Sequence, residues 1–427
     1  MGVDKKYTVP SERRIIYALF FICLVVRLLF KYLTGYDNYE LFVDAHRYDI
    51  LSTQITNGNY DLDIVAYLSA PLYSYTLALS KLISYDYWET IIVTYQFLLI
   101  SLSAVYIYKI TDHLFDNKLQ SIAASLIYIF YPLTLWLNFT LTQETCFQAY
   151  FIFFVFHFLR CVQDQSIKQL MLTTLFFAIA LLTKSHVLML IPFVSFIFIV
   201  NRKLLYAFLF PCIVFLYTIP HGLVNLKLHD IYTLSSHGNA SFFLLGHSDN
   251  TYDCLIKRAG ELGDFSAFGC DPSFVFDKEY IDPLHGKINQ LSVNERDRLR
   301  KEIAFDWITN NPAKYLNLKL VGIERFLLPG LDRRQYKTSY WLISLIVGLS
   351  IYIPGYLFLY RKLRDSWREH LLLPSIIVII GAIFILFFPV NRFRVITLEP
   401  LLIVYASYYY IKWIPERWRN RIVASMT

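Results

Sequence analysis

Long apolar stretches separated by short polar turns run along the chain from residue 15 to residue 412. Most are close to the roughly 20 residues that a helix needs to cross the hydrocarbon core of a bilayer. Two polar interruptions, 34–89 and 222–338, are much longer than the others. The pattern predicts ten transmembrane helices, at 15–33, 90–110, 119–137, 143–160, 168–183, 187–200, 204–221, 340–360, 371–388 and 395–412.

The composition supports a membrane protein. Of the 427 residues, 56% are hydrophobic and only 17% are charged, and the mean hydropathy is +0.43. A soluble domain carries about 25% charged residues, and a disordered or collagen-like chain has far fewer large apolar side chains. We therefore expect an all-α polytopic membrane protein of about ten transmembrane helices, with interfacial helices in the first outer loop and a large, mostly helical second outer loop.

The net charge of +7 is distributed unevenly. With the N-terminus inside, the cytoplasmic segments carry +10, whereas the first outer loop, 34–89, has eight acidic and two basic residues. Because Lys and Arg concentrate on the cytoplasmic side, both termini are predicted to be cytoplasmic. The positive charge therefore reflects topology and offers no basic face for nucleic acid.

These features divide the chain into three parts. Residues 1–221 hold transmembrane helices 1–7 and the acidic first outer loop, residues 222–338 form the large extracytoplasmic loop, and residues 339–427 hold helices 8–10 and a basic cytoplasmic tail. Cys254 and Cys270 both lie in the large loop, on the oxidising side of a cell envelope. A disulfide between them stays open as one alternative.

The first outer loop contains the densest set of polar and aromatic residues. Residues 41–56 have helical spacing, and Gly58 follows as a helix stop, so we expect a helix lying along the membrane interface. Asp44 lies about ten residues past the first transmembrane helix, and His46 follows it by two. A solvated acidic face is the simple alternative for the acids of this loop.

The order of residues in this loop resembles the type C (GT-C) membrane glycosyltransferases. The likeness is greatest to bacterial relatives of dolichyl-phosphate-mannose protein mannosyltransferases and of the lipid A aminoarabinose transferase. In the first loop it rests on Asp44, Tyr48, Gly58, Tyr60, Pro71 and Tyr73.

Further motifs extend the resemblance over nearly the whole chain. Each is weak alone, and their order and spacing are more specific than any one of them. They are Arg27, Leu181-Leu182-Thr183-Lys184, the stretch from Gly238 to His247, Glu295-Arg296-Asp297 with Asn311-Pro312 and Lys319, and Arg392-Phe393-Arg394 with Glu399-Pro400.

The resemblance implies an enzyme that transfers a sugar from a polyprenyl-phosphate carrier to an extracytoplasmic lipid, glycan or protein, by a single inverting displacement. In such a reaction a carboxylate takes the proton of the acceptor hydroxyl, and the resemblance gives this role to Asp44. Glu144, at the outer start of the fourth helix, is a candidate second acid. Its alternative is an ordinary acid at a helix N-terminus, where the macrodipole favours it.

The leaving phosphate of such a donor needs cations. Lys184, Arg392 and Arg394 lie in very short outer turns and therefore near the bilayer interface, and Arg325 precedes the eighth span. These four are the candidate donor-phosphate-binding residues. Snorkelling toward lipid headgroups, or pairing with neighbouring acids for Arg325, is the structural alternative.

No cofactor follows with certainty from the sequence. Asp44 and His46 could together bind a divalent cation, Mg²⁺ or Mn²⁺. The alternative is that His46 is structural, as a lone histidine more often is. Two other functions also stay open: a transporter or flippase, and a polysaccharide polymerase or ligase with a diphosphate-linked donor. The expected location is a bacterial inner membrane, with the active site on the periplasmic or extracellular side.

Overall fold

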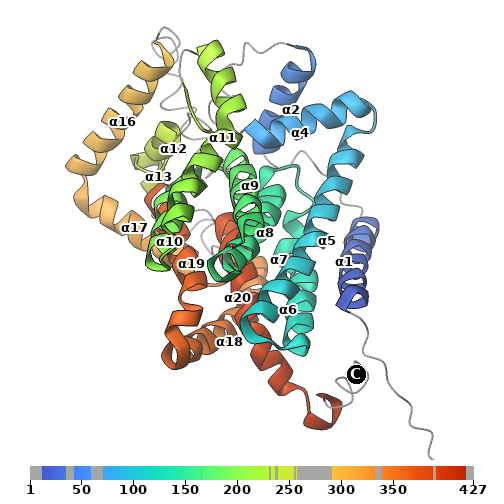
Figure 1. Cartoon of the computed structure of the whole chain (residues 1–427). Helices are drawn as coiled ribbons and strands as arrows, with labels where there is room; N and C mark the ends of the chain where they lie inside the picture. The colour runs from blue at the N-terminus through green and yellow to red at the C-terminus, as the bar shows by residue number, and fades with distance from the viewer. Residues whose placement is uncertain are drawn as a thin grey trace, which may run out of the picture.

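The computed structural model describes residues 12–34, 43–58, 71–164, 166–229, 232–235, 239–253, 256, 291–331, 338–387 and 391–419. Within these ranges every extended regular element is a helix (Figure 1). The predicted all-α class is therefore confirmed.

The first half of the chain supplies the centre of the bundle. The fourth predicted transmembrane segment forms α8, most of which is buried, because α5, α9 and α20 pack around it. Helix α1 lies at the edge of the molecule and buries only a narrow face against α5 and α6. The helices are α1 (Glu12–Thr34), α2 (Val43–Thr56), α4 (Pro71–Ile83), α5 (Trp88–Phe115), α6 (Lys118–Phe130), α7 (Pro132–Leu137), α8 (Gln143–Asp164) and α9 (Ile167–Thr183).

The second half begins with two further apolar helices, continues with short helices of the large loop, and ends with three long helices. Helix α20 packs between α18 and the central α8. The elements are the 3₁₀ helix η2 (Ser185–Met189), α10 (Leu190–Val200), α11 (Leu204–His229), α12 (Asn239–Leu245), α13 (Asp249–Tyr252), α16 (Val293–Asn310), α17 (Pro312–Leu327), α18 (Thr338–His370), α19 (Leu372–Phe387) and α20 (Asn391–Trp413).

Within the described residues, each predicted transmembrane stretch lies largely on helical structure. In the part of the chain that the structure describes, five helices are long and apolar enough to cross a membrane, namely α1, α5, α8, α18 and, over Leu204–Lys227, α11. Shorter apolar helices occur at Lys118–Phe130, Ile167–Thr183, Ser185–Val200 and Leu372–Phe387. One stretch differs from the prediction of a continuous helix over 119–137. It divides at Tyr131, because Pro132 has no N–H to continue the α6 hydrogen-bond ladder and begins α7 instead.

Arg27 stabilises this helix break. Its side chain is fully buried in α1, and its Nη1 donates to the carbonyl of Ile129 at 3.0 Å. Ile129 lies in the last turn of α6, where backbone carbonyls lack partners within the helix. The arginine singled out in the sequence thus joins α1 to the end of α6.

Helices α2 and α4, which lie in the described part of the first loop, pack on each other. Helix α2 ends as predicted: Gly58 adopts φ +70°, and its N–H bonds to the carbonyl of Ile55 at 3.1 Å. Lys81 of α4 donates to Asp49 of α2 at 2.5 Å and to Thr53 at 2.7 Å. Because the Lys81 side chain is almost completely buried, this ion pair holds α2 firmly against α4.

Candidate active site

Three of the predicted site residues meet in one cluster. Glu144 Oε1 lies 3.0 Å from Lys184 Nζ and 3.3 Å from Arg392 Nε. They come from the start of α8, the residue after α9 and the first turn of α20. The Glu144 and Lys184 side chains are buried, whereas the Arg392 side chain remains 29% exposed. One carboxylate thus holds two cations in place, and one of these cations reaches the surface of the cluster.

An aromatic side chain supports the cluster. Lys184 Nζ lies 4.6 Å from the ring centroid of Phe393, close enough for a cation–π contact. Phe393 in turn stacks on Phe384 of α19, with centroids 4.4 Å apart and an interplanar angle of 19°. The His186 ring lies within 6 Å of both. The last turn of α19 therefore helps to set where the two cations lie.

A buried hydrogen-bond chain connects the first loop with the start of α8. Tyr73 of α4 packs edge-on against Tyr48 of α2 and donates to Gln96 Oε1 at 2.9 Å. Gln96 Nε2 then donates at 3.2 Å to the carbonyls of Asn138 and Thr140, in the turn just before Glu144. Tyr48 and Tyr73, two of the three tyrosines of the first-loop motif, are thus packed toward the cluster.

The charge of this region also acts on Tyr73. Burial, followed by the nearby Cys146, Tyr48 and Glu144 groups, holds the pKa of the Tyr73 hydroxyl well above its ordinary value of 10.0. The neutral phenol therefore persists at physiological pH and stays a hydrogen-bond donor to Gln96.

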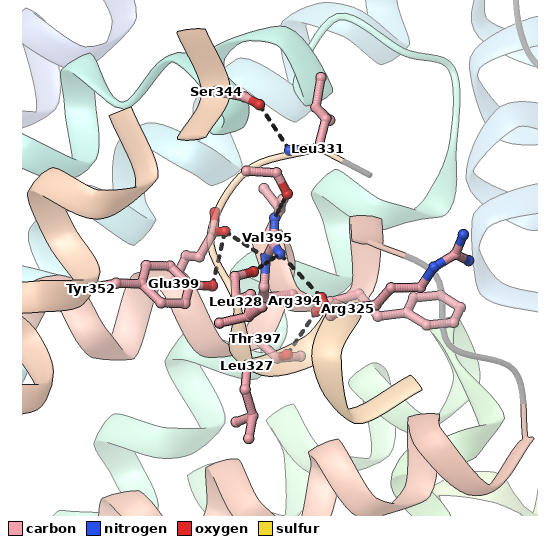
Figure 2. Close-up of polar contacts among 12 residues, drawn as sticks. Arg325, Leu327, Leu328, Leu331, Ser344, Tyr352, Arg394, Val395, Thr397 and Glu399 are labelled. Atoms are coloured by element: carbon pink, nitrogen blue, oxygen red, sulfur yellow. Dashed lines mark hydrogen bonds and ion pairs between the residues drawn. The ribbon is translucent and has the colours of Figure 1, made fainter. Parts of the chain in front are cut away.

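Arg394 lies in a separate network, two residues after Arg392 (Figure 2). Its Nε donates to Glu399 at 2.9 Å, its Nη1 to the carbonyls of Arg325 (3.0 Å) and Leu328, and its Nη2 to the carbonyl of Gly330 at 2.5 Å. The Arg394 and Glu399 side chains are buried. Arg394 thus joins α20 to the end of α17 and the turn after it.

This network has further partners. Glu399 also accepts from Tyr352 of α18 at 3.2 Å, and the N–H of Leu331 donates to Ser344 of α18 at 2.8 Å (Figure 2). Arg325 is buried as well, and its backbone carbonyl belongs to the network. The side chain of Arg394 is thus engaged with Glu399 and with backbone carbonyls, apart from the Glu144 cluster.

Comparison with known proteins bears on the part of the chain that includes Glu144 and Lys184. Residues 69–223 match the family model described as dolichyl-phosphate-mannose-protein mannosyltransferase. Over these residues the chain is similar to that family, which is consistent with the type C membrane glycosyltransferases. The match covers less than half of the chain and ends within α11, and no curated protein matches the chain significantly. The resemblance predicted from the sequence is confirmed, and with the apolar helices it indicates an integral membrane glycosyltransferase.

The remaining candidates of the transferase are described only in part. Asp44 lies in the first turn of α2, one turn before Tyr48 and on the same face of that helix, but its side chain lies outside the described residues. His46 is exposed on α2. Cys254 and Cys270 fall outside the described residues, so the disulfide stays a prediction. Among the described side chains no group of three or more His, Cys, Asp or Glu could hold a metal ion.

Several residues around the cluster were not singled out from the sequence. Gln96 is an isolated amide in an apolar stretch and has no local signal. Phe393 belongs to a motif quoted above, but that motif gives no indication of its contact with Lys184. Asp49, one of the acids for which a solvated face is the simple alternative, is 43% exposed and also pairs with the buried Lys81. The Asn138 side chain, which begins a glycosylation-like Asn-Phe-Thr sequence, is fully buried and therefore inaccessible to modification in this structure.

Proposed function

We propose that the chain transfers a sugar from a polyprenyl-phosphate-linked donor to an acceptor outside the cytoplasm. The observation that carries the proposal is the meeting of Glu144, Lys184 and Arg392 at the ends of three helices. A partly exposed arginine held by a buried carboxylate suits an anionic lipid phosphate, because the guanidinium keeps donors available while its position is fixed. The family match adds a glycosyl-transfer chemistry.

Within this proposal the cluster residues have different roles. Arg392 would contact the donor phosphate and stabilise the charge that develops on it as the sugar leaves. Lys184 adds a buried positive charge on the same carboxylate, and Glu144 keeps both cations in position. For Arg394 and Arg325, which the sequence predicts to bind phosphate, we propose a role in holding the turn after α17, because Arg394 donates to the backbone carbonyl of Arg325.

The transfer itself is proposed as a single inverting displacement. The acceptor oxygen forms a bond to the anomeric carbon, the bond from that carbon to the phosphate oxygen breaks, and the polyprenyl phosphate leaves as an anion. Asp44 would take the proton of the acceptor hydroxyl as general base. Its place on the Tyr48 face of α2 supports this role, because Tyr48 and Tyr73 connect that face with the turn before Glu144.

The setting follows from the charge pattern of the sequence. We propose both termini in the cytoplasm, the site on the periplasmic or extracellular side of a bacterial inner membrane, and a lipid, glycan or protein as acceptor. We keep Mg²⁺ or Mn²⁺ as a possible participant near Asp44 and His46, to be tested by assaying transfer with and without a chelator.

The test uses the full-length protein in vesicles supplied with a labelled polyprenyl-monophosphate sugar and membrane acceptors. We expect Asp44→Asn to lower turnover by roughly 100-fold or more, as for loss of a general base, at unchanged protein level. Asp86→Asn, an exposed acid of the same loop, is the matched control and should leave turnover unchanged.

The outcomes separate the competing functions. Normal turnover by the Asp44→Asn protein would exclude Asp44 as the base. Use of a diphosphate-linked donor in place of the monophosphate would favour a polymerase or ligase. Movement of the intact lipid-linked sugar across the bilayer without transfer would favour a flippase.

A further inference from the structure

Lys319, in the middle of α17, binds the end of a different helix. Its Nζ donates to the carbonyls of Ile385 at 3.1 Å and Leu386 at 2.9 Å, both in the last turn of α19. The last carbonyls of a helix have no partners within it and form the negative end of its dipole. The Lys319 ammonium therefore caps α19 from the large outer loop.

The capped turn reaches the Glu144 cluster through two ring contacts. Phe384, one residue before the first capped carbonyl, stacks on Phe393 with ring centroids 4.4 Å apart. Lys184 Nζ lies over the Phe393 ring, 4.6 Å from its centroid. Arg392, the neighbour of Phe393 in the chain, is the second cation of the cluster. Displacement of the last turn of α19 would thus shift both cations relative to Glu144.

The surroundings of Lys319 are largely apolar. Burial lowers its pKa from 10.5 to about 7. Among the described groups, the titratable side chains facing it are Tyr315 of α17, whose ring centroid lies 5.2 Å from Nζ, and His247, which stacks on Tyr315. Burial and then the Lys319 charge lower the pKa of His247 to about 4, so His247 is neutral near pH 7.

Among the described elements packed around Lys319, no second charge acts on it. Helix α19 carries no titratable residue between Leu372 and Phe387. On α20, Arg394 and Glu399 form their own ion pair at the far end of α17. Lys314, one turn earlier on α17, pairs with Asp249 at 2.6 Å.

We propose that Lys319 is a positioning residue for the Glu144–Lys184–Arg392 cluster, acting from the outer loop through the last turn of α19. Its effect on sugar transfer rests on the proposed function, whereas its effect on α19 does not. Hydrogen bonds from a charged donor are roughly twice as strong as those between neutral groups. The cap is therefore strongest when Lys319 is protonated and weakens as the pH rises through about 7.

Global stability has the opposite pH dependence. Because burial depresses the pKa of Lys319, the unfolded chain binds this proton more tightly, and deprotonation favours the folded state between about 7 and 10.5. A measurement of overall unfolding therefore cannot replace a local one. The last turn of α19 has to be observed directly.

The experiment compares Lys319→Met, Lys319→Arg and the control Lys314→Met in the full-length protein. Amide hydrogen exchange of peptides covering 381–396 is followed at about pH 6 and about pH 8.5, corrected for intrinsic exchange, together with donor turnover. We expect Lys319→Met to raise exchange there at both pH values and to lower turnover roughly 10- to 100-fold, as displaced catalytic groups do. Wild type should show faster exchange and lower turnover at the higher pH.

Lys319→Arg is the decisive variant, because arginine keeps its charge at both pH values and can reach the same carbonyls. It should remove the pH dependence of exchange and extend activity to higher pH, while Lys314→Met should resemble wild type. Unchanged exchange in Lys319→Met, or an unchanged pH profile in Lys319→Arg, would overturn the positioning role. Absence of transfer by every protein, wild type included, would contradict the proposed function and leave the exchange result to decide this inference.

Discussion

At the scale of single residues, Glu144 is the centre of the candidate site because its buried carboxylate neutralises two cations. Its side chain is 2% exposed and lies against Lys184 and Arg392. Removal of one member of a buried ion pair leaves the other charge without compensation, at a cost of about 3–5 kcal/mol. We therefore expect Glu144→Gln, which keeps the shape, to lower both the free energy of unfolding by about this amount and the transfer rate.

The control for Glu144→Gln lies at the other end of the same helix. Asp164 pairs with Arg160 at 2.5 Å, but both side chains are more than a third exposed. Such surface pairs contribute about 0–1 kcal/mol, so Asp164→Asn should change thermal unfolding in detergent little. Equal loss of stability in the two variants would show that the buried ion pairs of Glu144 contribute no more to stability than a surface ion pair.

Arg392 and Arg394 illustrate how two similar residues acquire different roles. The sequence predicts that Arg392 and Arg394 lie in one short turn and that both bind the donor phosphate. The structure instead places both in the first turn of α20, where residues two apart point in nearly opposite directions. Arg392 therefore meets Glu144, and Arg394 meets Glu399 and the turn after α17.

This difference predicts different kinetic effects for the same substitution. Arg394→Lys should mainly destabilise the protein, by about 1.5–3 kcal/mol for each charge-assisted hydrogen bond left unmade, while the KM for the donor stays unchanged in the folded fraction. Arg392→Lys should mainly raise that KM. Thermal unfolding and donor titration of the two variants provide the measurement, and a raised KM with normal stability in Arg394→Lys would restore its phosphate-binding role.

At the scale of elements, the turn between α17 and α18 depends on one glycine. Gly330 has φ +88°, and a Cβ there would lie 2.9 Å from the Cα and N of Leu345. Its carbonyl also accepts from Arg394. Gly330→Ala should therefore cost more than the about 1–2 kcal/mol of a left-handed backbone alone, since backbone atoms cannot move aside as a flexible side chain can.

Gly58 provides the comparison for this prediction. Its φ is +70°, but nothing lies within 4 Å of where a Cβ would be. Gly58→Ala should thus show the backbone cost without the clash, and thermal unfolding of both variants measures the difference. A loss in Gly330→Ala no larger than in Gly58→Ala would mean that the α17–α18 turn adjusts without penalty.

The helices were predictable because their signal is local and repeated, whereas the site was predictable only as a set of candidates. Apolar stretches of the right length predict most of the helices, and Gly58 predicts where α2 ends. Both signals can be recognised from neighbouring residues in the sequence. The break before Pro132 was not predicted, because the apolar residues continue across it. The acids and cations near the outer ends of helices were identifiable, but the pairing of Glu144 with Lys184 and Arg392 joins residues 40 and more positions apart, and only tertiary packing determines it.

At the scale of the whole molecule, the cluster constrains how the chain crosses the membrane. Helix α8 begins at the cluster, α9 returns to it and α20 begins there again, so these three ends lie on one side. Helices of both predicted outer segments, α2 and α4 from one and α12 and α16 from the other, gather at one end of the bundle in Figure 1. The charge pattern predicts that this side faces away from the cytoplasm.

This orientation predicts which engineered cysteines react from outside. Arg298 on α16 and Arg364 near the end of α18 are both well exposed, with 77% and 67% of their side-chain surface accessible. We expect Arg298→Cys to react with a membrane-impermeant maleimide in intact cells, and Arg364→Cys to react only after the membrane is opened, each measured above the labelling of the parent protein. Because the two positions have similar exposure, different access must come from the bilayer. The reverse pattern would place the Glu144 cluster in the cytoplasm and exclude an extracytoplasmic acceptor.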